Sequence, residues 1–163
     1  MQRGQTIIEA VVALMTIMII LTAIAIVIVN GLYNSRFIKN QNEANKYSQQ
    51  GMEFVRNIQK NNIEQFAGLV GAALAADPGF TTYCISGSTL TTDNCSPTVV
   101  NTADVYIRTI AFSPGIDKCD DRSEILTTVT VKWSSSKCSS NNTFCHKSEL
   151  VSCLPYIFPA NNP

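Results

Sequence analysis

Cysteine is the residue type with the clearest chemistry in this chain. The six cysteines, all in the second half, are Cys84, Cys95, Cys119, Cys138, Cys145 and Cys153. An even number confined to one small polar region is typical of disulfides formed in an oxidising compartment. The alternative is a zinc site with Cys138, Cys145, His146 and Cys153 as ligands. Six residues, rather than two to four, lie between Cys138 and Cys145 and between His146 and Cys153, so the spacing favours disulfides.

Two other groups of side chains could do chemistry. His146 and Glu149 could take part in acid–base catalysis, but no motif ties a Ser, Thr or Cys nucleophile to them. The stretch DKCDDRSE (117–124) offers oxygen ligands for Ca²⁺ but lacks the alternating ligands of a calcium loop, which favours a solvated turn. The chain also has no phosphate-binding glycine loop and no nucleophile elbow. We therefore predict that the protein is not an enzyme and uses no cofactor or metal.

The overall charge gives no general affinity for nucleic acid. The chain has 12 basic and 12 acidic residues among 163, so there is no basic excess to neutralise phosphates. DNA binding would need a local basic patch in the second half of the chain. The basic groups available for one are Arg108, Lys118, Arg122, Lys132, Lys137 and Lys147.

Glu9 is unusual because it stands at the head of a long apolar run. From Ile7 to Val29 the only polar side chains are Glu9, Thr16 and Thr22. A helix of this run would be about 35 Å long, which is enough to cross a hydrocarbon core of about 30 Å. The run is longer than the apolar core of a signal peptide, so a membrane-spanning helix is the better interpretation. An acid within a membrane is costly and is by default a functional residue, although near an interface it is tolerated.

The residues around Glu9 resemble the leader of type IV prepilins and pseudopilins. The motif is Arg3-Gly4-Gln5-Thr6-Ile7-Ile8-Glu9 followed by the apolar helix. The resemblance implies that residues 1–4 stay in the cytoplasm and that a prepilin peptidase cuts between Gly4 and Gln5. The new N-terminal residue is often methylated in this family, and Gln5 stands where Phe is commonest. Glu9 becomes the fifth residue of the mature chain, the position that the family reserves for Glu.

The same resemblance implies a role for Glu9 in assembly. Cleavage creates a cationic α-amino group at Gln5, about one helical turn before the carboxylate. In a bundle of helices from several subunits, family members are thought to pair this Glu with the terminal amine of a neighbour. A charge-assisted bond of this kind is strong in a water-poor core, and an unpaired partner there is costly. Glu9 is therefore expected to fix the axial register between subunits.

Beyond the apolar run the sequence keeps a helical period but loses its hydrophobicity. Ala44, Tyr47 and Gly51 recur at three- and four-residue spacings, with charges between them. This pattern predicts one continuous helix of about 55–60 residues that ends or kinks at Asn61-Asn62. Gly31 and Gly51 are expected to be weak points, each costing about 1 kcal/mol relative to Ala. The stretch GMEFVRNIQKNN also resembles the helix of PilV-type minor pilins.

The rest of the chain predicts a small sheet. Residues 66–80 read as a short helix and a connector with a turn at Pro78-Gly79. Alternating patterns predict strands at 104–112, 124–133 and 144–154, joined as an antiparallel meander that the helix covers. The fold class is α+β and pilin-like, with a long N-terminal helix packed on a disulfide-stapled sheet. The expected parts are a leader (1–4), a membrane-spanning half-helix (5–30), an amphipathic half-helix (31–65) and an extracytoplasmic head domain (66–163).

The meander places the cysteines in pairs. In an up-down-up order, Cys119 and Cys153 lie at one end of the sheet, and Cys138 and Cys145 lie in the loop at the other end. Cys84 and Cys95 bracket a separate polar loop. From the fifteen possible pairings we therefore select Cys84–Cys95, Cys119–Cys153 and Cys138–Cys145.

Together these features predict a minor structural subunit of a type IV pilus or related pseudopilus. Its expected partners are other pilin subunits, the prepilin peptidase and the cytoplasmic (inner) membrane. It would cross that membrane once before assembly and lie in an extracellular pilus or a periplasmic pseudopilus afterwards. The alternatives are a type II secretion pseudopilin, or a tip-located adhesin or DNA-uptake pseudopilin whose head domain binds a surface ligand or DNA. A further alternative is an ordinary single-pass anchored protein that never assembles.

Overall fold

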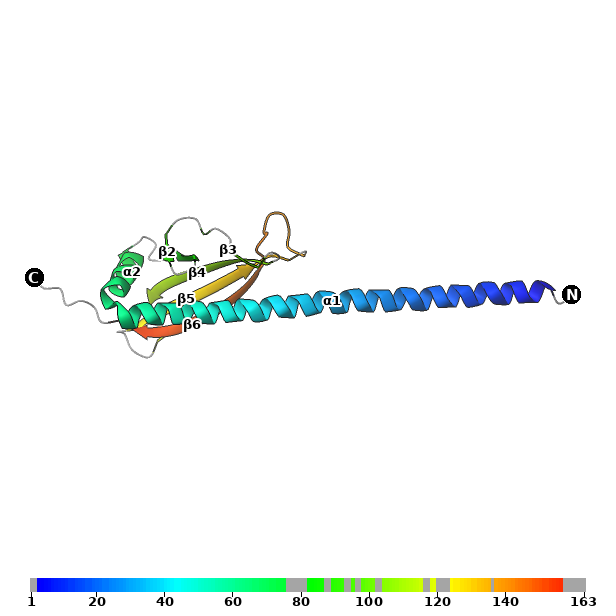
Figure 1. Ribbon diagram of the computed structural model, residues 1–163, viewed down its shortest axis with the longest axis horizontal. Coiled ribbons are helices and arrows are strands. Elements are labelled where there is room, and N and C mark those ends of the chain that lie inside the picture. Colours follow the sequence, from blue (N-terminus) through cyan, green and yellow to red (C-terminus); the bar gives the residue numbers. More distant parts are fainter. Residues whose placement is uncertain are drawn as a thin grey trace, which may run out of the picture. The chain divides into compact units, whose positions relative to one another are not determined.

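The computed structural model describes residues 3–75, 82–86, 89–92, 95, 98–101, 104–115, 118–119, 124–135 and 137–156 (Figure 1). The chain divides into two compact units, residues 1–39 and residues 40–163. Helix α1 (Arg3–Asn61) begins in the first unit and ends in the second. The predicted turn at Pro78-Gly79 lies outside the described residues.

The first unit, residues 1–39, contains the apolar part of α1. The predicted continuous helix forms: α1 has 59 residues, and no Pro interrupts the sequence before Pro78. Two hydroxyl groups in the apolar run donate hydrogen bonds to carbonyl oxygens of the preceding turn, Thr16 to Ala13 at 2.8 Å and Thr22 to Met18 at 2.7 Å. These bonds let threonine lie in an apolar stretch without an unpaired hydroxyl.

The second unit is α+β, as predicted, with the end of α1 and helix α2 packed on an antiparallel sheet (Figure 1). The sheet has six strands in the order β2-β1-β4-β5-β6, and β3 also pairs with β4. The strands are β1 (Thr82–Ser86), β2 (Thr89–Thr91), β3 (Thr98–Asn101), β4 (Asp104–Pro114), β5 (Glu124–Trp133) and β6 (His146–Pro155).

Strands β4, β5 and β6 form the predicted meander. Their register pairs Ile110 with Val129, and Val129 with Leu150. The predicted sheet had three strands, and this was wrong because the prediction missed β1, β2 and β3. Those strands have three to five residues and little apolar alternation, so local sequence does not mark them. β1 is fixed by pairing with β4, in which Tyr83 lies opposite Ile110.

The sheet and the end of α1 share one apolar core. Met52 and Val55 of α1 are buried in it together with Ile110 and Val129. The alternation in 124–133 places one row of side chains in the core: those of Ile125, Thr127, Val129, Val131 and Trp133 are all buried. Burial of this alternating row fixes the register of β5, since a shift by one residue would turn the row towards solvent.

Helix α2 (Ile63–Ala75) begins where the Asn-Asn pair predicts a break. Asn62 lies between the two helices, and its Oδ1 accepts a hydrogen bond from the backbone N–H of Gln65 at 3.1 Å. This bond satisfies one of the free N–H groups at the start of α2. Phe66 of α2 then packs edge-to-face on Phe112 with ring centroids 5.9 Å apart. The helix starts three residues before the predicted 66–80 segment because Asn62 caps it there.

Gly51 is a packing position rather than the predicted weak point. A Cβ atom added there would lie 2.8 Å from Cγ1 of Val129 and 3.2 Å from Cδ1 of Ile85. The helix can therefore approach the sheet this closely only without a side chain at residue 51. The helix-propensity cost of glycine is offset by close packing of α1 on β5.

Replacing Gly51 with Ala is expected to lower the free energy of unfolding of the head by about 1 kcal/mol. Overpacking typically costs about 1–3 kcal/mol, and the gain in helix propensity returns about 1 kcal/mol. Gly68→Ala is the matched control, because nothing lies within 4 Å of its added Cβ, and it is expected to raise stability by about 0.5–1 kcal/mol. Denaturant unfolding of the full chain in detergent measures both. A stabilising Gly51→Ala would contradict the packing role.

Thr127 places a polar group inside the core. Its side chain is 0% exposed, and its Oγ1 has no hydrogen-bond partner among the described residues. A buried hydroxyl without a partner is costly, so Thr127→Val is expected to raise the free energy of unfolding by about 1 kcal/mol. Thr128→Val, on the opposite half-buried face of β5, is expected to change it by less than about 0.5 kcal/mol. Equal effects of the two substitutions in denaturant melts would refute this account.

Candidate functional site

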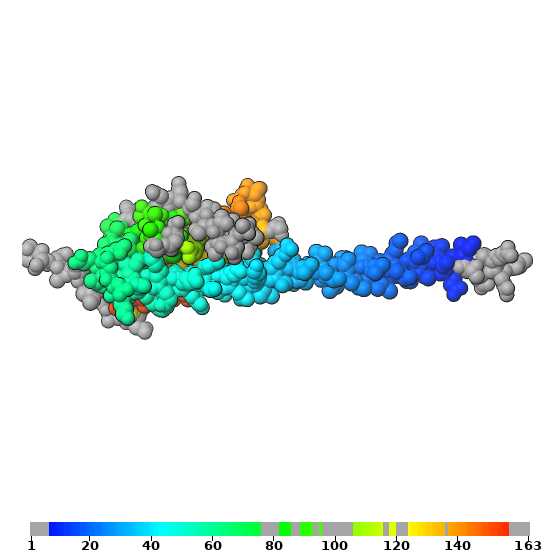
Figure 2. Space-filling model, viewed as in Figure 1, coloured from blue at the N-terminus to red at the C-terminus, as the bar shows by residue number. Residues whose placement is uncertain are grey.

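The apolar part of α1 is the first candidate site. In residues 7–29 the side chains are exposed in the structure of the single chain, and Figure 2 shows them as a continuous outer surface of the blue part of α1. The large apolar residues in this stretch are Ile7, Ile8, Val11, Val12, Leu14, Met15, Ile17, Met18, Ile19, Ile20, Leu21, Ile24, Ile26, Val27, Ile28 and Val29. A helix that is apolar on all sides is normally covered by lipid or by other helices.

By length and composition, α1 is the one helix among the described residues that is long and apolar enough to cross a membrane. The backbone hydrogen bonds of a helix are internal, as a membrane-spanning segment requires. This finding fits the predicted membrane anchor.

Glu9 is the single acidic or basic residue between Ile7 and Val29. Its side chain is exposed on α1 and is surrounded along the helix by apolar neighbours such as Ile8 and Val12. Any lipid or helix that covers this surface would also cover the carboxylate, which then needs a cationic or hydrogen-bonding partner. Glu9 is therefore the one position between Ile7 and Val29 where a covering group would have to satisfy a charge.

The predicted processing position lies just before this surface. The backbone of Gly4 and Gln5 belongs to the first turns of α1, and their side chains lie outside the described part of the chain. Gln5 and Glu9 are four positions apart in the sequence, which places the two Cα atoms about 6 Å apart along the helix axis. An amine at Gln5 and the carboxylate of Glu9 would thus lie at neighbouring levels of the helix.

The cysteines form three disulfides in the pairs selected from the meander: Cys84–Cys95, Cys119–Cys153 and Cys138–Cys145. The bond from Cys119 ties the β4–β5 connection to the end of β6. The bond between Cys138 and Cys145 closes the β5–β6 loop. Cys84 belongs to β1, so the loop that the first pair brackets contains the β1–β2 hairpin, which the sequence did not predict.

Gly115 lets the β4–β5 connection fold closely against β5. An added Cβ would lie 2.6 Å from the carbonyl oxygen of Glu124 and 2.9 Å from Sγ of Cys119. The carbonyl oxygen of Gly115 also accepts a hydrogen bond from the N–H of Cys119 at 2.9 Å. This tight turn brings Cys119 to its partner Cys153.

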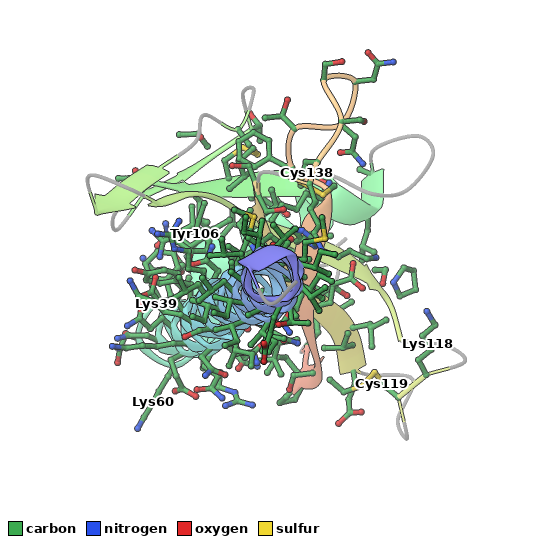
Figure 3. The ribbon with its side chains drawn as sticks, turned by 90° about the vertical axis from the view of Figure 1, so that its right-hand side faces the viewer. Lys39, Lys60, Tyr106, Lys118, Cys119 and Cys138 are labelled. Carbon is green, nitrogen blue, oxygen red and sulfur yellow. A yellow bond between two sulfur atoms is a disulfide. The ribbon has the colours of Figure 1, made fainter. Side chains whose placement is uncertain are left out.

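The structure does not bring the four candidate zinc ligands together. The ligand atoms of Cys138, Cys145 and His146 lie within 4.8 Å of one another, but the two sulfur atoms are bonded to each other. Cys153 is bonded to Cys119, and Figure 3 shows Cys119 well apart from Cys138. Zinc binds cysteine as a thiolate, so the oxidised pairs do not supply its ligands.

His146 and Glu149 are not brought together either. The register pairs His146 with Trp133 and Glu149 with Thr130, which places the two side chains on opposite faces of the sheet. Glu149 instead forms an ion pair with Lys147 at 2.9 Å.

The contact between His146 and Ser135 was not predicted from the sequence. Oγ of Ser135 lies 2.9 Å from Nε2 of His146, and the His146 ring stacks on Trp133 with centroids 5.5 Å apart. Ser135 precedes His146 by eleven residues across the β5–β6 loop, and no local pattern links them. The backbone N–H of Lys137 also donates to Oγ of Ser135 at 3.3 Å. These bonds fix the base of the disulfide-closed loop.

Among the described basic residues of the head, Arg108, Lys118 and the Lys132–Lys147 pair lie in different places. Arg108 faces α1, with its guanidinium carbon 5.8 Å from the centre of the Tyr47 ring. Burial lowers the pKa of Arg108, and the charge interaction with Tyr47 opposes that shift. Lys118 lies beside Cys119, away from Cys138 (Figure 3), whereas Lys132 and Lys147 are exposed and lie opposite each other. Arg122 and the acidic residues of the candidate calcium loop, except Glu124, lie outside the described residues.

Comparisons of the chain with protein-family models, with curated proteins and with solved structures found no match.

Proposed function

We propose that the chain is a structural subunit of a type IV pilus or a related pseudopilus, of the minor pilin kind. It is made as a precursor anchored in the cytoplasmic membrane by α1. A prepilin peptidase removes residues 1–4, and the apolar part of α1 then packs against the same part of other subunits. The head, held by three disulfides, faces an oxidising compartment or the outside of the cell.

One observation carries this proposal: Glu9 is the lone charged residue of an exposed, wholly apolar helix surface, five residues after Gly4. A plain membrane anchor gains nothing from an acid at this position, since the acid raises the cost of insertion. A bundle of identical helices does gain from it, because each carboxylate can accept a hydrogen bond from a neighbour's terminal amine. The α+β architecture of the head supports the same conclusion.

The proposal predicts the mass of the mature chain. Protein isolated from the cells that make it should begin at Gln5, and Gly4→Leu should accumulate as the full-length precursor in the membrane. Intact-mass spectrometry distinguishes the two forms. Ser48→Ala, a substitution far from the cleavage position, is the control and should be processed normally. A mature protein that begins at Met1 would overturn the proposed function.

A further inference from the structure

The Cys138–Cys145 disulfide closes the loop between β5 and β6, which projects beyond the end of the sheet and is orange in Figure 1. Residue Cys145 is exposed, whereas the other five cysteines are half-buried or buried. A nucleophile from solvent therefore has its easiest access to a disulfide of the head at Cys145. Attack at Cys145 makes Cys138 the sulfur that leaves, so the surroundings of Cys138 decide how readily the bond opens.

Three hydrogen-bond donors face the sulfur atom of Cys138. The backbone N–H groups of Ser135 and Cys145 donate to it, with N···Sγ distances of 3.3 and 3.4 Å. Oγ of Ser135 lies 3.8 Å from the same Sγ. A disulfide sulfur carries no hydrogen, so the hydroxyl is the donor in this contact. Hydrogen bonds to an ionised acceptor are about twice as strong as those to a neutral one, so these donors stabilise a thiolate at Cys138.

Two further contacts direct the hydroxyl proton of Ser135 towards Cys138. Oγ of Ser135 accepts a hydrogen bond from the N–H of Lys137 at 3.3 Å and lies 2.9 Å from Nε2 of His146. A hydroxyl group has one proton and two lone pairs. With its proton on the side of Cys138, Oγ accepts from both neighbours, and Nε2 of His146 carries a hydrogen. Ser135 is thus a positioning residue for the sulfur atom of Cys138.

We propose that Cys138–Cys145 is a site of thiol–disulfide exchange with small-molecule thiols, in which Cys145 is attacked and Cys138 leaves. The incoming thiol loses its proton to water, and its thiolate forms an S–S bond with Sγ of Cys145. The bond between Cys145 and Cys138 breaks, and its electron pair stays on Cys138 as a thiolate. A dithiol completes the reduction, because its second thiolate attacks its own sulfur in the mixed disulfide and releases Cys145 as a thiolate. The dithiol is oxidised to a disulfide, and the chain gains two electrons.

The Cys119–Cys153 bond has different surroundings and provides an internal reference. Both of its cysteines are half-buried, and Sγ of Cys153 lies 3.8 Å from the carbonyl oxygen of Lys118. A carbonyl oxygen accepts a hydrogen bond from a neutral thiol and repels a thiolate, which disfavours Cys153 as a leaving group. The exchange site is independent of the proposed function, since it requires neither cleavage of the chain nor assembly.

The rate of opening is measured on the full oxidised chain in detergent at neutral pH. Dithiothreitol is added, free thiols are capped with N-ethylmaleimide at intervals, and the chain is digested without reduction for mass spectrometry. Cys138–Cys145 is expected to open at least about tenfold faster than Cys119–Cys153, because its accessible sulfur is attacked and a stabilised thiolate leaves. Equal or slower opening of Cys138–Cys145 would overturn the exchange site.

Reduced glutathione, used in place of dithiothreitol, shows which sulfur atom is attacked. Trypsin cuts after Lys137 and Lys147, so both cysteines of the loop lie in one peptide of residues 138–147. Fragment spectra of this peptide are expected to place glutathione on Cys145 and the maleimide on Cys138. The reverse arrangement, or equal amounts of the two, would contradict the assignment of Cys138 as the leaving sulfur.

Ser135→Ala tests the positioning role, because it removes the hydroxyl and keeps the backbone N–H. It is expected to slow the opening of Cys138–Cys145 by about threefold and to leave the opening of Cys119–Cys153 unchanged. Ser135→Thr keeps a hydroxyl and should open at the native rate. Ser139→Ala, at an exposed position of the same loop, is the matched control and should also open at the native rate. An unchanged rate for Ser135→Ala would refute the role of its hydroxyl.

Discussion

The Glu9→Ala chain is expected to be cut after Gly4 and to be almost absent from filaments. The substitution removes the one acid of the apolar surface and leaves the neighbour's terminal amine without a partner in a water-poor bundle. Removing one partner of a buried charge pair is strongly destabilising, so incorporation should fall by more than about tenfold. The helix itself is unaffected, because Ala is a better helix former than Glu.

Shearing cells and comparing the subunit in the filament and membrane fractions by immunoblot measures this loss. Glu9→Gln separates charge from shape, because it keeps the size of the side chain and removes the negative charge. It should resemble Glu9→Ala. Glu53→Ala is the matched control on the same helix: Glu53 is exposed and forms an ion pair with Arg56 at 2.7 Å, and its loss should leave incorporation unchanged. Normal incorporation of the Glu9→Ala chain into filaments would contradict the proposed assembly role of Glu9.

Removing the Cys119–Cys153 disulfide is expected to cost more stability than removing Cys138–Cys145. The first bond closes a chain separation of 34 residues and the second one of 7. In the chain-entropy model these loops correspond to losses of about 3.5–4 and about 2–2.5 kcal/mol. The first bond also ties the end of β6, which pairs only with β5 in the described sheet, to the β4–β5 connection.

Guanidinium unfolding of the full chain in detergent gives both values, with the double Cys→Ser variants as the samples. Trp133 is the only Trp of the chain and is buried in the sheet, so its fluorescence reports on the head. The fully reduced native chain gives the combined loss of all three disulfides, Cys84–Cys95 included. The two variants could instead lose equal stability, or the loss could be larger without Cys138–Cys145. Either result would show that these bonds do not stabilise the head by lowering the entropy of the unfolded chain.

The sequence by itself determined the features that local physics specifies. The unbroken apolar run and the absence of Pro require a long helix, and Asn62 marks its end by capping α2. The alternating residues of β4 and β5 predict two strands and assign the side chains of each to two faces. The order of the strands was enough to select Cys119–Cys153 and Cys138–Cys145, because the start of one strand lies beside the end of its antiparallel neighbour.

The tertiary structure decided what depends on contacts between distant residues. Strands β1, β2 and β3 are too short to be marked by their own sequence, and β1 exists because Tyr83 lies opposite Ile110 of β4. From the sequence, Gly51 only weakens the helix. In the structure Val129 lies so close to it that no side chain fits at residue 51. The side chain of His146 contacts Ser135 rather than Glu149, because the fold of the β5–β6 loop brings Ser135 next to it. Hydrophobic periodicity acts over a few residues, whereas these arrangements follow from packing between segments far apart in the chain.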